Sequence, residues 1–205
     1  MLSKFLDPKN DLAFARIFGT ERNKDILIHF LNDIFGYTTD PIVQVTFLKN
    51  RQDPMIAAQR VSIVDILCQD TLGNHFIVEM QVAREPGFEK RAQYYAAKTY
   101  IEQRKKGLEY HHLKRVTFLS IADFILFPNK PNYLSHHVIL DKNSYEHDLQ
   151  DFSFSFLELP KFKKTKAQLV TLTEKWAYFF KHAEDTHESE LPQLVGTDKI
   201  IERAL

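Results

Sequence analysis

The sequence predicts an α/β fold in which a central mixed β-sheet is flanked by helices. Three observations lead to this prediction. Two segments with apolar residues at helical spacing, residues 9–19 and 21–35, come before any strand-like run. Two short runs rich in Val and Ile, residues 61–68 and 76–81, then follow, separated by a segment that favours a turn. Strand-like and helical patterns alternate along the rest of the chain, which is typical of α/β proteins.

Each predicted helix has start or stop signals of its own. Asn10 or Asp11 can cap the first helix, and Gly19 ends its apolar pattern. Gly36 ends the second helix in the same way, and a Pro-Gly pair precedes the third. The predicted helices are residues 9–19, 21–35, 88–107 and 169–182.

The strand-like runs are rich in β-branched and aromatic residues. The runs 61–68 and 76–81 are expected to pair as antiparallel strands, because Asp, Thr, Gly and Asn lie between them. The predicted strands are residues 42–48, 61–68, 76–81, 115–121, 133–140 and 151–159, with a connection over residues 49–60. We expect residues 1–160 to form one domain and residues 161–205 a C-terminal helical extension.

Composition limits the classes of function. The chain has 27 Lys and Arg residues and 27 Asp and Glu residues, so a nucleic-acid site would have to be a local patch. Cys68 is the sole cysteine, so no intrachain disulfide can form, and a reducing cytoplasmic compartment fits best. No signal peptide and no membrane-spanning stretch is recognisable, so we expect a soluble protein without a membrane partner.

Three polar side chains in the predicted strand pair suggest a site: Asp65, Glu79 and Gln81. Glu79 and Gln81 point to the same face, because side chains alternate along a strand. Asp65 interrupts an apolar run, and carboxylates are rarely buried without a partner. Two acids and an amide on one face suit a hard cation such as Mg²⁺. The alternative is that Asp65 and Glu79 are solvated residues on an open face of the sheet.

The order of these elements resembles the PD-(D/E)XK nuclease superfamily, whose restriction-endonuclease-like fold is a central mixed sheet flanked by helices. The resemblance covers residues 7 to 176, most of the chain. Its sharpest motifs look like the transposase-related branch, which includes the recombination-promoting nucleases of bacteria. These motifs are residues 10–19 (NDLAFARIFG), Asp65, Glu79-Met80-Gln81, Arg91 and Tyr94-Tyr95.

Three features depart from that pattern. The third catalytic position, usually Lys across the superfamily, is Gln81, and the first-helix Lys of the branch is Arg16. Arg keeps the charge of Lys but changes the geometry of the donors. The chain also stops at Leu205, earlier than typical members of the branch, so a C-terminal portion is either missing or naturally absent.

The resemblance implies a metal-dependent DNA endonuclease that hydrolyses phosphodiester bonds in recombination, transposition or genome defence. The implied cofactor is Mg²⁺, or Mn²⁺ or Ca²⁺ in its place, which would activate water and stabilise charge on the phosphate. Gln81, being neutral, can only orient that water. The implied catalytic residues are Asp65, Glu79 and Gln81, and the implied metal ligands are Asp65, Glu79, the backbone of Met80, and Asp11.

Three further assignments have plainer alternatives. Asp11 can serve simply as a helix cap or first-turn acid. Arg91 and Tyr94 lie three residues apart on one helix face; Arg91 would contact a phosphate or order Glu79, and Tyr94 would pack beneath the site. Their alternative is a solvated Arg beside a core Tyr. With Arg16, these two residues are the candidates for DNA binding or site support.

Two other sets of residues are weaker signals. The basic clusters 104–106 and 161–166 are explained by a solvated face, although DNA cleavage needs phosphate neutralisation from somewhere. The histidine pairs 111–112 and 136–137 lack zinc-site spacing. DNA is the expected partner, with a homodimer or a targeting partner left open. The alternative function is a weakly active or inactive member of the fold that binds DNA or protein.

Overall fold

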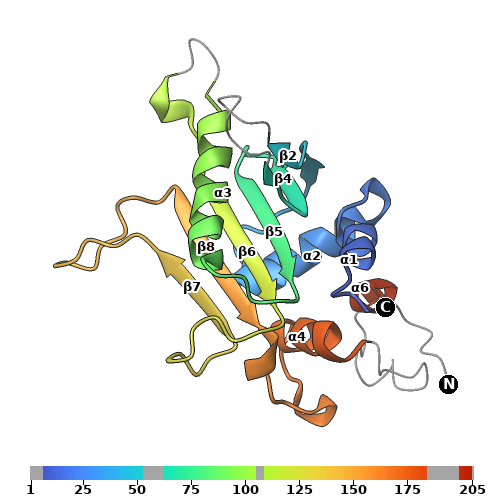
Figure 1. The fold of residues 1–205 in the computed structure, drawn as a ribbon. Coiled ribbons are helices and arrows are strands. Elements are labelled where there is room, and N and C mark those ends of the chain that lie inside the picture. The colour runs from blue at the N-terminus through green and yellow to red at the C-terminus, as the bar shows by residue number, and fades with distance from the viewer. Residues whose placement is uncertain (1–6, 53–61, 105–108, 184–198, 205) are drawn as a thin grey trace.

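A six-stranded mixed sheet forms the centre of the computed structural model, which describes residues 7–52, 62–104, 109–183 and 199–204 (Figure 1). The strand order is β1-β4-β5-β6-β8-β7. β1, β4 and β5 pair antiparallel, β5, β6 and β8 pair parallel, and β7 returns antiparallel to β8. The strands are β1 Val45–Phe47, β4 Ile66–Asp70, β5 His75–Gln81, β6 Val116–Ala122, β7 Leu134–Val138 and β8 Phe152–Glu158. The predicted α/β fold with a mixed sheet is confirmed.

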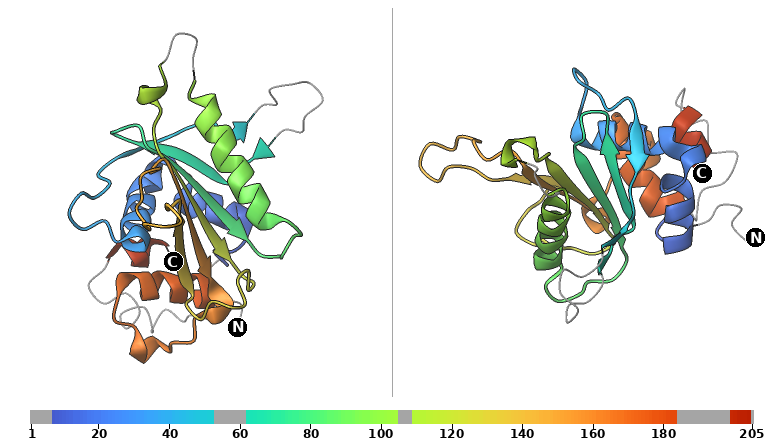
Figure 2. Two further views of the ribbon diagram at one scale, coloured as in Figure 1. Left: turned by 90° about the vertical axis from the view of Figure 1, so that its left-hand side faces the viewer. Right: turned by 90° about the horizontal axis from the view of Figure 1, so that it is seen from above.

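Helices cover both faces of this sheet, as the view from above in Figure 2 shows. Helix α3 lies on one face, and α1, α2, α4 and α6 lie on the other. The α-helices are α1 Asp11–Phe18, α2 Lys24–Phe35, α3 Phe88–Glu102, α4 Leu172–His182 and α6 Lys199–Ala204. Short 3-10 turns are η1 Glu21–Asn23, η2 Tyr110–His112, η3 Leu159–Lys161 and η4 Lys166–Gln168.

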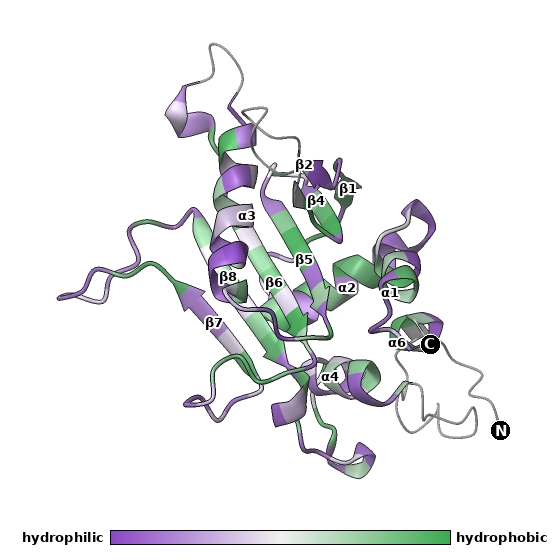
Figure 3. Ribbon diagram, viewed as in Figure 1, coloured by the Kyte–Doolittle hydropathy of each residue, from purple (hydrophilic) through white to green (hydrophobic). Residues whose placement is uncertain are grey.

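Two apolar clusters follow from this layering. The side chains of Val78, Met80 and Ile121 pack with α1, α2 and α4, whereas Ile77 and Phe118 pack with α3. Neighbouring residues of β5 and β6 therefore face opposite clusters, which is the two-residue period of a strand buried on both sides. Apolar residues dominate these central strands, and polar residues are more frequent on the outlying turns (Figure 3).

The predicted helix ends follow from local chemistry. Asn10 caps α1 by accepting hydrogen bonds from the backbone N–H groups of Leu12 and Ala13. Gly36 ends α2 with a φ of 66°, a left-handed conformation that a residue with a Cβ rarely adopts. Thr171 and Glu174 form a capping box, so α4 begins at Leu172 rather than at the predicted residue 169.

The predicted strand over residues 42–48 is shorter in the structure, where β1 begins at Val45. The side chain of Asn32 accepts from the N–H of Ile42 at 2.8 Å and donates to its carbonyl at 2.9 Å. These bonds satisfy the backbone of Ile42 without a strand partner. The predicted connection 49–60 contains a short strand, β2 Arg51–Gln52, which pairs with β3 Ser62–Ile63. Residues 53–60 of that connection lie outside the described residues.

Helix α4 belongs to the same apolar cluster as the first two helices. Trp176 is fully buried, and its ring lies 5.2 Å from that of Phe30 and 5.9 Å from that of Phe18. Its Nε1 donates to Asp33 of α2 at 2.7 Å. The expected boundary between a domain of residues 1–160 and a C-terminal extension lies within η3, and residues on both sides of it belong to one apolar cluster.

Candidate active site

Asp65 and Glu79 are held together by two hydrogen bonds that cross between their segments. The backbone N–H of Asp65 donates to Glu79 Oε1 at 3.1 Å, and the N–H of Met80 donates to Asp65 Oδ2 at 2.8 Å. Asp65 lies in the break between β3 and β4, where the predicted strand 61–68 is interrupted. The break places the carboxylate of Asp65 beside the end of β5, where its Oδ2 reaches the backbone of Met80.

Gln81 extends this pair toward helix α3. Its Nε2 donates to Glu79 Oε2 at 3.1 Å, and its Oε1 accepts from Arg91 Nη2 at 2.6 Å. Arg91 also forms an ion pair with Glu85 through Nη1. The Nε of Arg91 is buried and has no hydrogen-bond partner in the described part of the chain. The guanidinium is therefore fixed beside the carboxylates by Gln81 and Glu85.

Burial gives the two carboxylates unusual acidities. Glu79 is only 3% exposed, and this desolvation, reinforced by the charge of Asp65, raises its pKa to about 8. Burial also raises the pKa of Asp65, the N–H of Met80 opposes the rise, and the charge of Asp11 adds to it. Arg91 lowers both pKa values. Without a cation, the pair therefore favours a proton, and a divalent metal would replace that proton.

The donor set suits a cation that keeps several waters. Asp65 and Glu79 supply carboxylate oxygens, and the carbonyl of Met80 lies on the same strand edge as its N–H, which faces Asp65. Across the described residues, no three His, Cys, Asp or Glu side chains are grouped closely enough to hold an ion. Two carboxylates completed by water and substrate phosphate match the usual environment of Mg²⁺ rather than an all-protein cage.

The structure places the supporting candidates unevenly. Asp11 lies at the exposed start of α1, close enough for its charge to raise the pKa of Asp65. Arg16 is exposed on the same helix and lines a surface hollow with Arg22 and Arg203. Neither Asp65 nor Glu79 lines this hollow.

The expectation that Tyr94 packs beneath the site is wrong. Tyr94 is 48% exposed, whereas the next residue, Tyr95, is half-buried. Burial raises the pKa of Tyr95, and the negative charge of Glu79 raises it further, so Tyr95 is the tyrosine near the carboxylates. On a helix, residues three apart and residues four apart both lie on one face. Arg91 and Tyr95 are four apart, so Tyr95 shares a face with Arg91.

The weaker sequence signals have structural explanations. His136 Nδ1 bonds to the hydroxyl of Ser155 at 2.8 Å, and the His137 ring lies 5.0 Å from that of Phe127. Cys68 is buried in the core, and burial raises the pKa of its thiol to about 12. In the first basic cluster, Lys105 and Lys106 lie outside the described residues.

Comparison with known families agrees with this geometry. The family model described as PD-(D/E)XK nuclease family transposase matches residues 8–205. The chain belongs to this family. Searches of curated proteins and of solved structures gave no match. The resemblance drawn from the sequence motifs is therefore confirmed over nearly the whole chain.

Membership of the PD-(D/E)XK nuclease family transposases indicates a nuclease-type hydrolase that acts on nucleic acid. Nucleases of this class usually use divalent metal ions, and the two carboxylates at the end of β5 are suitable ligands. Within the described segments, no helix is long and apolar enough to cross a membrane.

Proposed function

We propose that the chain is a metal-dependent DNA endonuclease whose active site is formed by Asp65, Glu79 and Gln81. The observation that carries this proposal is the cross-bonded pair of buried carboxylates at the end of β5. Keeping two acids together in a largely apolar setting is costly, and here it raises the pKa of both. A strongly perturbed pair of this kind is typical of catalytic sites.

The residues divide the work of hydrolysis among them. Asp65, Glu79 and the carbonyl of Met80 would hold the metal, with Asp11 as an outer acid. When bound, a divalent ion supplies a Lewis acid for the phosphate and lowers the pKa of a coordinated water. Gln81 orients the attacking water by hydrogen bonding, since its amide has both donors and an acceptor.

Arg91 supplies the positive charge that Lys gives at the third catalytic position elsewhere in the superfamily. Its guanidinium contacts Gln81 directly at 2.6 Å, so a cation still lies next to that position. Its charge would stabilise the negative charge that develops on the scissile phosphate. Tyr95 lies close to this group.

The test is the nicking of supercoiled plasmid by the purified chain. We expect conversion to open-circular and linear DNA with Mg²⁺ or Mn²⁺ and none with EDTA. Binding of the same plasmid without any cleavage, under every metal tried, would instead support a DNA-binding module with an inactive site. A failure to bind or cleave DNA would contradict the proposal.

Gln81→Ala should weaken cleavage without abolishing it. The substitution removes hydrogen bonds to Glu79 and Arg91, and bonds to charged groups contribute about 1.5–3 kcal/mol, so we expect a loss of roughly ten- to a hundredfold in rate. Gln81→Lys should likewise retain activity, because it introduces the usual cation of the superfamily. Single-turnover cleavage rates measure the effect, and calorimetric Mg²⁺ titration shows whether metal binding is preserved. Complete loss of cleavage in Gln81→Ala with unchanged metal affinity would mean that Gln81 acts directly in the chemistry.

A further inference from the structure

A second polar group adjoins the candidate active site at the end of the neighbouring strand. The N–H of Asp123, the residue after β6, donates to the carbonyl of Gln81 at 2.9 Å. β5 and β6 are in parallel register there, with Gln81 opposite Ala122. The backbone therefore fixes Asp123 directly beside the third catalytic position.

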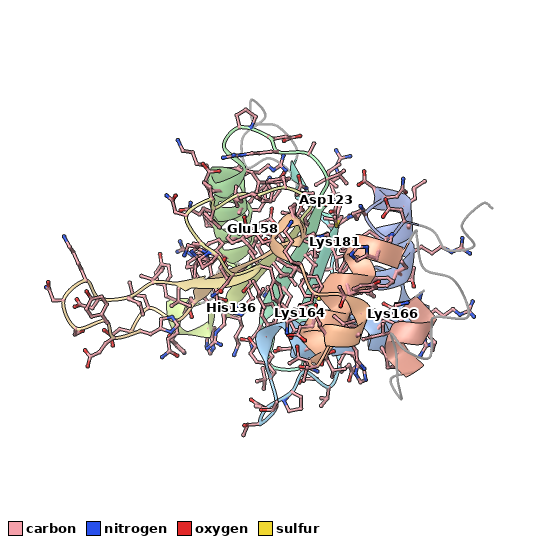
Figure 4. All side chains as sticks on the ribbon, turned by 90° about the horizontal axis from the view of Figure 1, so that it is seen from below. Asp123, His136, Glu158, Lys164, Lys166 and Lys181 are labelled. Atoms are coloured by element: carbon pink, nitrogen blue, oxygen red, sulfur yellow. The ribbon has the colours of Figure 1, made fainter. Side chains whose placement is uncertain are left out.

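Two lysines from distant parts of the chain lie near this carboxylate. Lys9, from the turn before α1, forms an ion pair with Asp123 Oδ2 at 3.1 Å. Lys181, from α4, donates to the carbonyl of Phe162 at 2.6 Å, and its side chain lies close to Asp123 when the molecule is seen from below (Figure 4).

Lys163 completes the group. Burial lowers the pKa of Lys181, the positive charge of Lys163 lowers it further, and the charge of Asp123 opposes both effects. Lys163 is exposed to solvent. Lys163 directly follows Phe162, whose carbonyl accepts from Lys181, so Lys163 lies near Lys181 rather than against Asp123 itself. Two ammonium groups thus lie near one carboxylate with a third beside them, and a local positive charge remains although the chain as a whole is neutral.

The excess positive charge suits a polyanion that passes the active site. We propose that Lys9, Lys163 and Lys181 form a binding site for the phosphate backbone of duplex DNA beside the scissile bond. This proposal rests on the proposed function in that the bound duplex is also the substrate. Asp123 holds Lys9 in position before DNA arrives and gives way when a phosphate replaces it. The site explains how a chain without net positive charge neutralises DNA next to its carboxylates.

The lysine pair Lys163 and Lys142 allows a matched test. Lys142 is also exposed, but it lies on the arm between β7 and β8, which projects away from α1 and α4 (Figure 1). Lys163→Glu and Lys142→Glu change the net charge equally, so only the position differs. Binding is measured by fluorescence anisotropy of a labelled DNA duplex in EDTA, where no cleavage occurs.

We expect Lys163→Glu to raise the dissociation constant about tenfold and to flatten its salt dependence, because a phosphate contact is lost. Lys142→Glu should stay near wild type. Asp123→Asn should bind about threefold more tightly, since the lysines lose the competing carboxylate. That increase also separates the proposal from misfolding, because a damaged fold lowers affinity.

Two results would overturn the phosphate site: equal weakening by the two glutamate variants, or weaker binding in Asp123→Asn. Neither result bears on catalysis. If nicking persists in wild type while Lys163→Glu binds normally, the proposed function stands and this site is wrong. If the anisotropy results hold while no metal supports nicking, the phosphate site stands without the nuclease activity.

Discussion

Asp65→Asn and Glu79→Gln are expected to abolish metal-dependent DNA cleavage, each by on the order of a thousandfold or more. Both variants keep the size of the side chain and an oxygen that can accept the cross-strand hydrogen bond from Asp65 or Met80. What each variant removes is one of the two carboxylates that we propose as metal ligands. The Lewis acid and the activated water are then lost together, because both depend on the same ion.

The measurement is the rate of plasmid nicking at saturating Mg²⁺, with calorimetric titration of the metal alongside. Asp148→Asn is a suitable control, because Asp148 is exposed on the arm between β7 and β8. The control should cleave at the wild-type rate. Cleavage that survives in either site variant would show that the metal is held elsewhere.

The candidate site was largely predictable from the sequence because it depends on local pattern. Strand alternation places Glu79 and Gln81 on one face, and the structure brings both to the α3 side of the sheet, where Arg91 lies. The interruption of an apolar run by Asp65 is a break between two strands, β3 and β4. These features arise within a few residues of the chain, so spacing reveals them.

Other features could not be predicted, because contacts between remote segments decide them. The strand over residues 42–48 is cut short by Asn32, a helix residue that replaces a strand as the partner of Ile42. The cluster at Asp123 combines Lys9 with Lys181, which lie at opposite ends of the chain. Only the packing of the helices against the sheet brings such residues together.

The choice between Tyr94 and Tyr95 shows a third limit. Both lie at helical spacing from Arg91, and the exact rotation of α3 against the sheet decides which ring is covered. Phe88 and Ala92 are buried on α3, and Tyr95 lies on the turn that follows them. Hydrophobic periodicity predicts which face of a helix is buried only to within one residue. The packing of the helix against the sheet decides which of the neighbouring residues is covered.

The metal-free protein should become more stable when Glu79 is replaced by Gln, the same change that removes activity. The pKa of Glu79 is about 8 in the folded chain and 4.5 ordinarily. The folded state therefore holds a proton that the unfolded state releases between these pH values. Its stabilising contribution is complete below pH 4.5, declines as the pH rises, and is lost above about pH 8.

Each pH unit between the folded and unfolded pKa corresponds to about 1.4 kcal/mol, so the wild-type free energy of unfolding should fall by a few kcal/mol across this range. Glu79→Gln has no proton to lose there, although it gives up a hydrogen bond between Gln81 and an ionised Glu79 worth about 1.5–3 kcal/mol. In EDTA near pH 9, we expect the variant to melt roughly 5–10 °C above wild type, a difference that shrinks toward acid pH.

Thermal unfolding at several pH values, with and without Mg²⁺, tests this expectation. The metal should stabilise wild type above pH 8, where Glu79 is ionised, and should leave Glu79→Gln nearly unchanged. Glu89→Gln serves as the control, since Glu89 is exposed at the start of α3 and its replacement should not alter the pH profile. If wild type and Glu79→Gln show parallel profiles, the buried carboxylate does not carry the raised pKa. Divergent profiles would instead mean that the negative charge of Glu79, which metal binding requires, destabilises the metal-free fold. The site would then be arranged to bind its ligand at the expense of the stability of the metal-free protein.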